Sequence, residues 1–269
     1  MAEPSPFDDA AIYYDRFRAP YAPAALRYIG DTLDLGRDAR VLDLGCGPGT
    51  IAIPLSRLAV EVVAVDPGAA MLAEARRLAA LRGVTNIRWI QGRAEDLPSD
   101  LGTFQLVTMG QSFHWMDRDR VLRQLADLVE PGGALAILDE GRRRPQESWE
   151  PLAAAVAGRF LARRGRHPLK HPEVAHAPSL RRSSHFADFT VREFAFEITR
   201  DTASILGCVY AGVGLSKSVL GERAAAFETE LVEALLRLNP SGLFHEQLET
   251  AVLIAPRRSP GLVTPAEQT

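Results

Sequence analysis

The sequence predicts an α/β protein with a doubly wound, open sheet and a helical cap. From residue 39, short runs rich in β-branched residues alternate with helical stretches, which is typical of βαβ units and a parallel sheet. A glycine-rich loop, VLDLGCGPGT (residues 41–50), follows the first of these runs. Further helical stretches lie outside the alternating region, at residues 7–35 and 147–238, and these would form the cap.

Each element of the alternating region has its own local signal. We expect strands at residues 39–45, 61–66, 87–92, 104–110 and 133–140, with helices at residues 50–59, 69–83 and 117–129 between them. Gly83 ends the second of these helices and Asp117 is the N-cap of the third. Later in the chain we expect a helix at 147–166, irregular structure at 167–186, a strand at 189–198, a helix at 221–238 and a last strand at 248–258.

These elements predict four segments. Residues 1–38 would form an N-terminal helical lid, 39–140 a ligand-binding core, 141–258 the cap helices with the last two strands, and 259–269 a disordered tail. The tail is expected to be disordered because it is rich in proline and small polar residues.

Composition bounds the function. The chain has 269 residues, 46% of them hydrophobic and 24% charged, and a net charge of −3, which does not favour a general nucleic-acid or membrane binder. The first residues have no secretory pattern, and no segment approaches the roughly 20 apolar residues of a membrane span, so a cytoplasmic location is expected. Cys46 and Cys208 are too few and too far apart for a disulfide framework or a thiolate metal cluster.

The glycine loop predicts a site for an anionic group. Gly45, Gly47 and Gly49 lie at the carboxyl end of the first strand, where open α/β sheets bind ligands, and the next helix begins close by with free N–H groups. The spacing G-x-G-x-G differs from the dinucleotide pattern G-x-G-x-x-G, and no Gly-Lys-Ser/Thr follows. A pyrophosphate is therefore not the best-fitting ligand, although each glycine alone is also compatible with a tight turn.

Four motifs in register carry a family resemblance. VLDLGCGPGT, VVAVDPGAAMLAEAR, GRAEDLP and LADLVEPGGALAIL resemble, in order, the motifs of class I S-adenosylmethionine-dependent methyltransferases of the type 11 or UbiE-like kind. The resemblance covers residues 38–140. It implies a seven-stranded Rossmann-like methyltransferase sheet with a helical cap, S-adenosyl-L-methionine as cofactor and S-adenosyl-L-homocysteine as product.

The residues offer a partner for each part of this cofactor. Backbone at the three glycines can approach the methionine end because no Cβ intervenes. Asp66 ends the second strand, where a carboxylate can accept hydrogen bonds from both ribose hydroxyls, or can cap the next helix. The other positions that we expect around the cofactor are Tyr14, Asp43 at the ammonium, Pro67 and Met71 against the adenine, the Ala94 backbone with the Glu95 or Asp96 side chain at its edge, and Gln111. Arg93 departs from the aspartate common in relatives, which puts the adenine edge in doubt.

A second resemblance concerns the methyl acceptor. His114, Trp115 and Asp117 in MGQSFHWMDRDR, and YYDRFRAPYAP near the N-terminus, are similar to segments of the branch that includes the trans-aconitate and farnesoic acid methyltransferases. We expect His114 or Glu140 as the catalytic base, unless His114 only packs beside a core Trp115 and Glu140 pairs with the arginines after it. The expected acceptor contacts are Tyr13, Arg18, Trp115 and Tyr210.

A basic stretch suggests the charge of the acceptor. Residues 141–185 contain nine arginines and one lysine against three glutamates, which favours an anionic metabolite, although solvated surface arginines are the simpler interpretation of any one position. Four histidines also lie here, at 167, 171, 176 and 185, without the spacing of a structural zinc site, so we expect no metal.

The sequence therefore predicts transfer of a methyl group to an oxygen or carbon of a small, anionic metabolite. An RNA or protein methyltransferase, a catalytically silent cofactor-binding module and a nicotinamide oxidoreductase are the alternatives. A homo-oligomer stays open, and neither membrane nor nucleic acid is an expected partner.

Overall fold

One mixed sheet organises the molecule. The computed structural model describes residues 11–143, 148–161, 172–186, 188–212 and 215–258. Within them the strands form a seven-stranded sheet in the order β3-β2-β1-β4-β5-β7-β6. The first five are parallel neighbours, whereas β7 is antiparallel to both β5 and β6. The strands are β1 (Arg40–Leu44), β2 (Glu61–Asp66), β3 (Ile87–Gln91), β4 (Phe104–Gly110), β5 (Val129–Arg143), β6 (Thr190–Asp201) and β7 (Leu243–Pro256).

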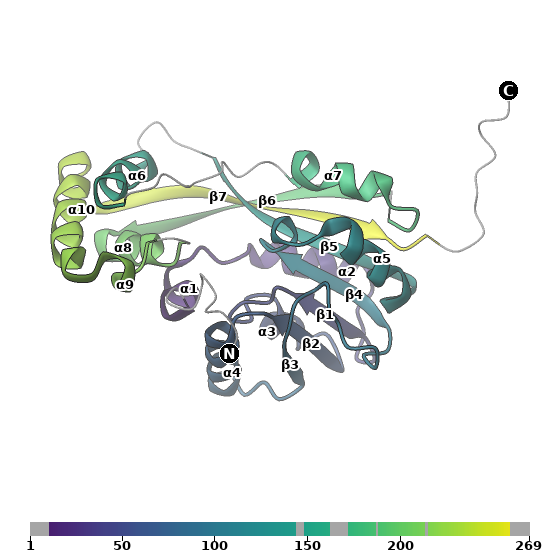
Figure 1. The fold of residues 1–269 in the computed structure, drawn as a ribbon. Helices are drawn as coiled ribbons and strands as arrows, with labels where there is room; N and C mark the ends of the chain where they lie inside the picture. Colours follow the sequence, from purple (N-terminus) through teal and green to yellow (C-terminus); the bar gives the residue numbers. More distant parts are fainter. Residues whose placement is uncertain (1–10, 144–147, 162–171, 187, 213–214, 259–269) are drawn as a thin grey trace, which may run out of the picture.

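Helices cover both faces of the sheet, as the alternating pattern predicts (Figure 1). The helices are α1 (Ala11–Phe17), α2 (Pro23–Thr32), α3 (Ala52–Leu55), α4 (Ala69–Leu81), α5 (Arg118–Leu128), α6 (Trp149–Phe160), α7 (Pro172–Arg182), α8 (Thr202–Tyr210), α9 (Lys217–Leu220) and α10 (Ala224–Leu238), with single turns η2 (Phe113–Trp115) and η3 (Gly221–Arg223). Asp117 caps α5 by accepting a hydrogen bond from the Arg120 N–H, and α4 ends before Gly83, whose φ is +66°. Both signals therefore act as predicted.

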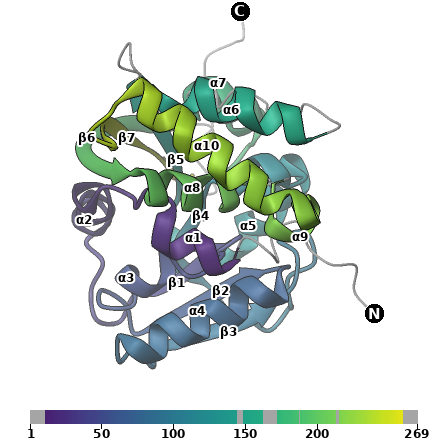
Figure 2. The ribbon, with the colours of Figure 1, turned by 90° about the vertical axis from the view of Figure 1, so that its left-hand side faces the viewer.

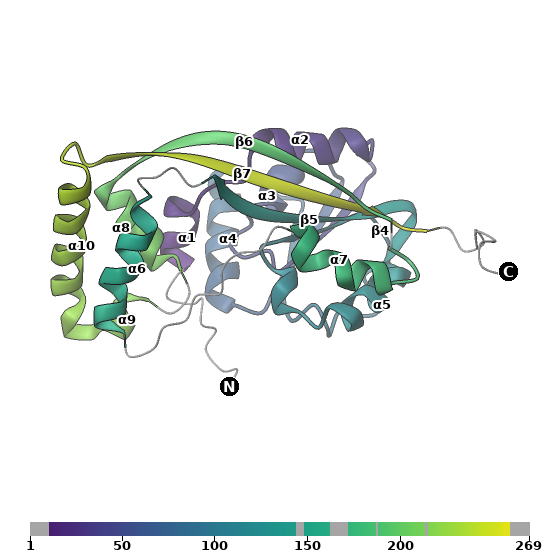
Figure 3. The ribbon, with the colours of Figure 1, turned by 90° about the horizontal axis from the view of Figure 1, so that it is seen from above.

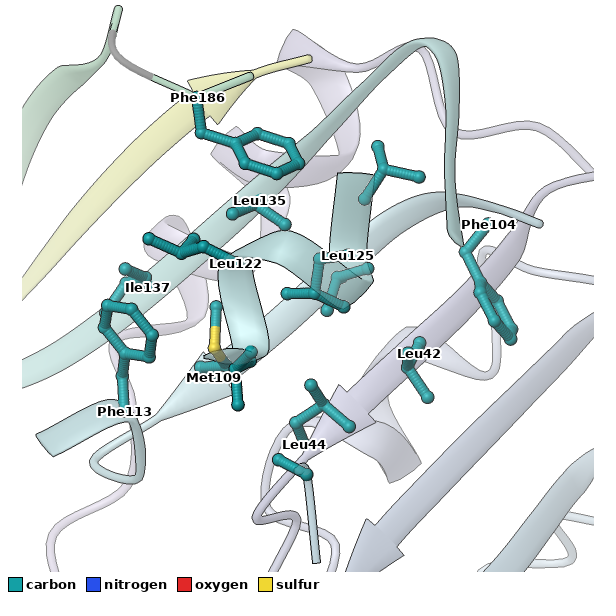
Figure 4. Packing of buried hydrophobic residues seen from close by; sticks show 14 of the residues in the cluster. Leu42, Leu44, Phe104, Met109, Phe113, Leu122, Leu125, Leu135, Ile137 and Phe186 are labelled. Carbon is teal, nitrogen blue, oxygen red and sulfur yellow. The ribbon is translucent and has the colours of Figure 1, made fainter. Parts of the chain in front are cut away.

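The side chains of each strand alternate between two buried clusters. One cluster packs α5 and α7 on one face of the sheet, and Figure 4 shows part of it; among its members are Leu42, Leu44, Met109, Phe113, Leu122, Leu125, Leu135, Ile137, Leu180 and Phe186. The other packs α2, α3 and α4 on the opposite face through Ala25, Ile29, Val41, Ala52, Leu55, Leu72, Leu106, Ala136 and Leu138. Asp43 and Glu140 share the face of the second cluster, whereas Asp139 shares the face of the first.

The cap is built on an extension of the sheet. β6 and β7 form a long antiparallel pair, and α6, α8, α9 and α10 gather at the end away from β4 (Figures 1 and 3). These helices enclose a third buried cluster, which includes Trp149, Val156, Ile205, Tyr210, Phe227, Leu231 and Phe244. Helix α1 lies between the cap and the core, near both α8 and α4 (Figure 2). The helices of the cap and the final antiparallel strands thus form one unit.

Three element predictions need correction. Residues 167–186 are not wholly irregular, because α7 occupies Pro172–Arg182. The sequence does not predict this helix, because Pro172, Pro178 and several polar residues interrupt the apolar periodicity. The helix expected at 50–59 is a single turn, α3. β5 begins at Val129 rather than at residue 133, and the residues before Ala134 form an irregularity within the strand. The predicted tail, residues 259–269, lies outside the described residues.

Candidate functional site

The glycine loop is built from three left-handed residues at the carboxyl end of β1. The φ angles of Gly45, Gly47 and Gly49 are +66°, +53° and +84°. A Cβ on Gly45 would lie 2.4 Å from the Ser112 Cβ, and one on Gly49 would lie 2.9 Å from the Trp89 ring. A Cβ on Gly47 would meet nothing within 4 Å. Packing therefore requires glycine at positions 45 and 49. Gly47 faces open space, and only its left-handed backbone conformation favours glycine there.

Asp66 joins this loop to the end of β2. Its Oδ2 accepts a hydrogen bond from the Gly47 N–H at 2.8 Å, and its Oδ1 accepts one from the Gly68 N–H at 2.8 Å. The side chain is buried. Asp66 therefore holds together the loops that follow β1 and β2.

Asp43 lies beneath the glycine loop, on the α3 side of β1. Its Oδ1 accepts a hydrogen bond from the Thr108 hydroxyl at 2.7 Å, and its Oδ2 accepts one from the Ala52 N–H at 3.1 Å. Burial raises the pKa of Asp43 to about 7, against the opposite effect of these two hydrogen bonds. A nearby cation such as an ammonium group would favour the ionised form.

The residues expected at an adenine lie along α4 and the loop after β3. Met71 is buried and packs against Ala11 and Tyr14 of α1, whereas Pro67 is exposed at the start of the turn after β2. The structure therefore brings α1 against the expected adenine wall.

The loop after β3 carries two further expected adenine contacts. Ala94 and Glu95 are both buried. Glu95 Oε1 accepts a hydrogen bond from the Asp117 N–H at 2.9 Å, and Oε2 lies 3.4 Å from the Arg93 Nε. Burial raises the pKa of Glu95, but these partners outweigh it and the pKa is lowered overall. Glu95 thus holds the start of α5, and its role at an adenine stays a prediction.

Gln111 combines backbone strain with an unpartnered amide. Its φ is +51°, which is uncommon for a residue with a side chain, and its N–H donates to the Leu138 carbonyl at 2.9 Å. The side-chain Nε2 is buried and has no hydrogen-bond partner among the described residues. Strain and an unsatisfied donor at the carboxyl end of β4 are typical of a ligand site.

Arg18 and Glu140 form an ion pair that the sequence does not indicate. The Arg18 Nε lies 3.5 Å from the Glu140 Oε1, and the guanidinium lies 4.9 Å from the centre of the Tyr14 ring. Glu140 therefore has a described partner 122 positions earlier in the chain; the side chains of residues 141–147 lie outside the described ones. A base role for Glu140 would require this pair to loosen.

Tyr21 is a site residue that the sequence analysis missed. The Tyr21 hydroxyl packs against the backbone of Gly110. A Cβ at position 110 would lie only 2.6 Å from the Tyr21 Oη, so a side chain there would clash. Burial raises the pKa of both Tyr21 and Tyr14, so both phenols stay protonated hydrogen-bond donors. The glycine that ends β4 was the available signal, since it implies the close approach of another group.

The turn η2 presents the two residues that resemble an acceptor segment. His114 and Trp115 are exposed, with ring centroids 5.3 Å apart. The alternative that placed Trp115 in the core is wrong, because Trp115 is 61% exposed and Phe113 is the buried residue of the turn. Partial removal from water lowers the pKa of His114, with Asp139 opposing this effect.

Tyr13 and Tyr210 meet in the cap rather than beside the glycine loop. Their ring centroids are 5.3 Å apart, and Tyr210 is buried. The Tyr210 hydroxyl donates a hydrogen bond to the Glu228 Oε1 at 3.0 Å, and burial, followed by this carboxylate, raises the pKa of Tyr210. Their contact with an acceptor stays a prediction.

Buried Asp139 and His176 form a second pair that the sequence analysis did not find. The His176 Nε2 lies 2.8 Å from the Asp139 Oδ2, joining α7 to β5 just beyond the end of β4. The sequence analysis expected irregular structure around His176, whereas the residue lies on helix α7. The signal was weak because the two residues are 37 positions apart and the helix itself was not predicted.

The basic stretch gives less support to an anionic acceptor than the sequence suggests. Arg159 pairs with Glu230, and Arg182 lies 3.1 Å from Asp119. The guanidinium of Arg181 lies over the Phe189 ring. The remaining basic residues of this stretch are in regions whose side chains are not described, as are His167 and His171.

Two searches of the described residues gave negative results. They contain no group of three histidine, cysteine, aspartate or glutamate residues placed to hold a metal ion. Among the same residues, no helix has both the length and the apolar character that crossing a bilayer requires.

The sheet order and the glycine loop define the Rossmann-like methyltransferase fold. A family model described as a methyltransferase domain matches residues 41–133. An S-adenosylmethionine-dependent methyltransferase from Thiobacillus denitrificans, solved with S-adenosyl-L-homocysteine, superposes with a TM-score of 0.55 at 20% identity, covering 96% of this chain and 100% of that one. A [4+2]-cyclase superposes with a TM-score of 0.52 at 20% identity, covering 89% and 84% of the two chains, so the fold alone does not fix the reaction.

Curated relatives match about half of this chain. An uncharacterized methyltransferase of Mycobacterium tuberculosis is 35% identical over 132 residues, which cover 49% of this chain and 51% of the relative. A ubiquinone biosynthesis O-methyltransferase of Xanthomonas oryzae is 33% identical over 147 residues, covering 54% and 61% of the two chains. The matches thus span only about half to three fifths of these relatives.

Proposed function

We propose that the protein is an S-adenosylmethionine-dependent methyltransferase that acts on a small molecule. The observation that carries the proposal is the hydrogen bond between Asp66 and Gly47, which joins the carboxyl ends of β1 and β2 around a glycine that faces open space. The match of residues 41–133 to a methyltransferase domain and the names of the relatives support it.

The residues present fit this cofactor. Gly47 leaves room for a close approach of a ligand to backbone, and Asp66 has acceptor capacity for ribose hydroxyls. Gln111 offers a buried donor without a partner among the described residues, and buried Asp43 would gain an opposite charge from an ammonium group. When bound, S-adenosylmethionine supplies a methyl group on a sulfonium, which is an excellent leaving group, so the protein contributes mainly positioning and exclusion of water.

The acceptor would bind above β4 and β5, between the core and α1. Arg18, Tyr14, Tyr21 and Glu140 line this region from one face, and His114 and Trp115 approach from the turn after β4. A carboxylate or other anionic group would bind Arg18 by replacing its 3.5 Å contact with Glu140. Oxygen and carbon acceptors are both compatible with this arrangement, and one curated relative is named an O-methyltransferase.

Calorimetric titration tests the cofactor first. We expect S-adenosylmethionine and S-adenosylhomocysteine to bind at micromolar strength, and failure of both to bind would contradict the proposal. Transfer of labelled methyl from S-adenosylmethionine to pooled small metabolites then separates an enzyme from a silent binding module. A shift of labelled RNA at moderate salt, with no small-molecule transfer, would instead favour the RNA methyltransferase.

A further inference from the structure

The buried pair of Asp139 and His176 occupies the edge of the sheet where ligands bind. Asp139 follows Leu138, which pairs with Gly110 and whose carbonyl accepts the Gln111 N–H, so it lies within β5 just beyond the point where β4 ends. His176 reaches it from α7, with an Nε2 to Oδ2 distance of 2.8 Å. His176 is 1% exposed and Asp139 is 7% exposed. A histidine and a carboxylate this deeply buried require an explanation.

The second ring nitrogen of His176 supplies the key observation. Nδ1 is buried and has no hydrogen-bond partner among the described residues. When a neutral imidazole donates its Nε2–H to a carboxylate, Nδ1 carries an unshared lone pair and can only accept a proton or a hydrogen bond. A carboxylate that fixes the tautomer of a histidine in this way is the arrangement that makes a histidine an effective base.

The surroundings of His176 connect it to the turn expected at the acceptor. Its ring lies 5.3 Å, between centroids, from that of Phe113, the residue before His114. Helix α7 lies against the turn η2, and the Arg118 guanidinium lies 5.6 Å from the centre of the same Phe113 ring. Trp115 adds an exposed aromatic face at the same turn. The cluster therefore combines an oriented histidine with an apolar ring at the carboxyl end of β4.

We propose that His176 is the general base of the methyl transfer, that Asp139 positions it, and that the acceptor is a phenolic hydroxyl. This inference rests on the proposed function. The hydroxyl proton passes to the His176 Nδ1, the oxygen electron pair forms the bond to the methyl carbon, and the carbon–sulfur bond breaks with its electrons on sulfur. The proton then leaves His176 for water, which restores the base.

Proton affinity selects the phenolic class. A phenol has an ordinary pKa of about 10, within reach of an imidazole base, whereas a carboxylic acid is already ionised at neutral pH and needs no base. An aliphatic alcohol holds its proton far more tightly than either group.

Nitrogen-detected NMR of the full-length protein tests the base without any acceptor. With S-adenosylhomocysteine added at about pH 8, we expect the His176 ring to carry a proton on Nε2, facing Asp139, and none on Nδ1; a His176→Gln variant assigns the signal. A ring protonated on both nitrogens at that pH would overturn the proposal, because no lone pair would remain. Since this readout needs no methyl transfer, it is separate from the calorimetric test of the cofactor.

Methyl transfer to two probes tests the acceptor class. Labelled S-adenosylmethionine is supplied with catechol, a phenolic probe, or with benzoate, a carboxylate probe. We expect transfer to catechol, a roughly 100-fold lower kcat for His176→Gln with unchanged cofactor affinity, and partial recovery as the pH rises and the phenol ionises by itself. Glutamine keeps a donor for Asp139, so a purely structural role would leave kcat near normal and would overturn the proposal.

The controls complete the design. His185→Gln, an exposed histidine just beyond α7, should leave kcat and the pH profile unchanged. Asp139→Asn should lower kcat less than His176→Gln and shift the pH profile, because it weakens the orientation of the ring without removing the base. Transfer to benzoate alone, or to neither probe by a protein that binds S-adenosylmethionine, would overturn the phenolic assignment.

Discussion

The Oδ2 atom of Asp66 accepts a hydrogen bond from the Gly47 N–H at 2.8 Å. This single contact joins two loops that follow different strands, β1 and β2. It means that Asp66 shapes the glycine loop without a ligand, so the conformation of the loop and the ligand contact that we propose depend on the same carboxylate.

Replacing Asp66 should therefore affect both stability and binding. In Asp66→Ala the N–H groups of Gly47 and Gly68 lose their acceptors, and we expect unfolding free energy to fall by about 1–3 kcal/mol. Affinity for S-adenosylmethionine should fall roughly 100-fold, since hydrogen bonds to a charged group are lost, and calorimetry measures this. Asp188→Ala is the control, because Asp188 is exposed and pairs with Arg258. Near-normal affinity of Asp66→Ala would refute its place at the ribose.

A matched pair of glycines separates backbone strain from ligand contact. Gly47 and Gly83 have φ angles of +53° and +66°, and a Cβ on either would meet nothing within 4 Å. Alanine at each site should cost about 1–2 kcal/mol and lower the melting temperature by a few degrees. Only Gly47→Ala should also weaken S-adenosylmethionine binding, because Gly83 lies at the far end of α4. Equal affinities of the two variants would show that Gly47 does not face the cofactor.

The raised pKa of Asp43 predicts that cofactor affinity depends on pH. Burial raises its pKa to about 7, so much of the carboxyl is neutral at pH 6 and most is ionised at pH 8. Since an ammonium group pairs with the ionised form, affinity for S-adenosylmethionine should rise up to about tenfold between these values. Calorimetry in two buffers should detect proton release on binding below pH 7. Asp43→Asn should abolish the rise, and a flat profile in the unaltered protein would contradict the assignment.

The same raised pKa has a consequence for stability. Because folded Asp43 holds its proton more tightly than the unfolded chain does, its contribution is fully present below about pH 4 and is lost as the pH rises through about 7. Comparing the slopes of unfolding free energy against pH for the protein and for Asp43→Asn, without ligand, measures this contribution. An identical slope for both would show that Asp43 titrates at its ordinary value.

What the sequence predicts well is local. The order of strands and helices from β1 to β5 follows from apolar runs, Asp117 and Gly83, which are signals contained within a few residues. The glycine loop is equally local, because three left-handed residues in five positions require glycine whatever surrounds them. The fold and the conformation of the glycine loop could therefore be anticipated before any coordinates.

The acceptor side depends on contacts that no short pattern contains. Arg18 and Glu140 are 122 residues apart in the chain, and Asp139 meets His176 only because α7 packs on the sheet despite Pro172 and Pro178. A carboxylate beside an arginine-rich run suggests local pairing, yet the described partner of Glu140 comes from the segment after α1. Long-range pairing of this kind is set by the packing of whole elements, which the sequence reveals only after the fold is known.

A double-mutant cycle should reveal whether Arg18 and Glu140 act as a unit. The pair is largely buried, with side-chain exposures of 25% and 13%, although its 3.5 Å separation is long for a hydrogen bond. We expect Arg18→Met and Glu140→Gln each to lower unfolding free energy, and the double variant to lose less than their sum, with a coupling of roughly 1–2 kcal/mol. Urea unfolding of the four proteins measures it.

The pair of Arg40 and Glu61 is the matched control for this cycle. Its 2.7 Å contact is shorter, but the side chains are 31% and 35% exposed, so water screens the attraction and the expected coupling is at most about 1 kcal/mol. A larger coupling for Arg18 and Glu140 despite the longer distance would show that burial at the acceptor region, rather than separation, sets its strength. If the two coupling energies are equal, Glu140 holds Arg18 no more strongly than Glu61 holds Arg40 at the surface. An anionic acceptor could then bind Arg18 without a competing partner.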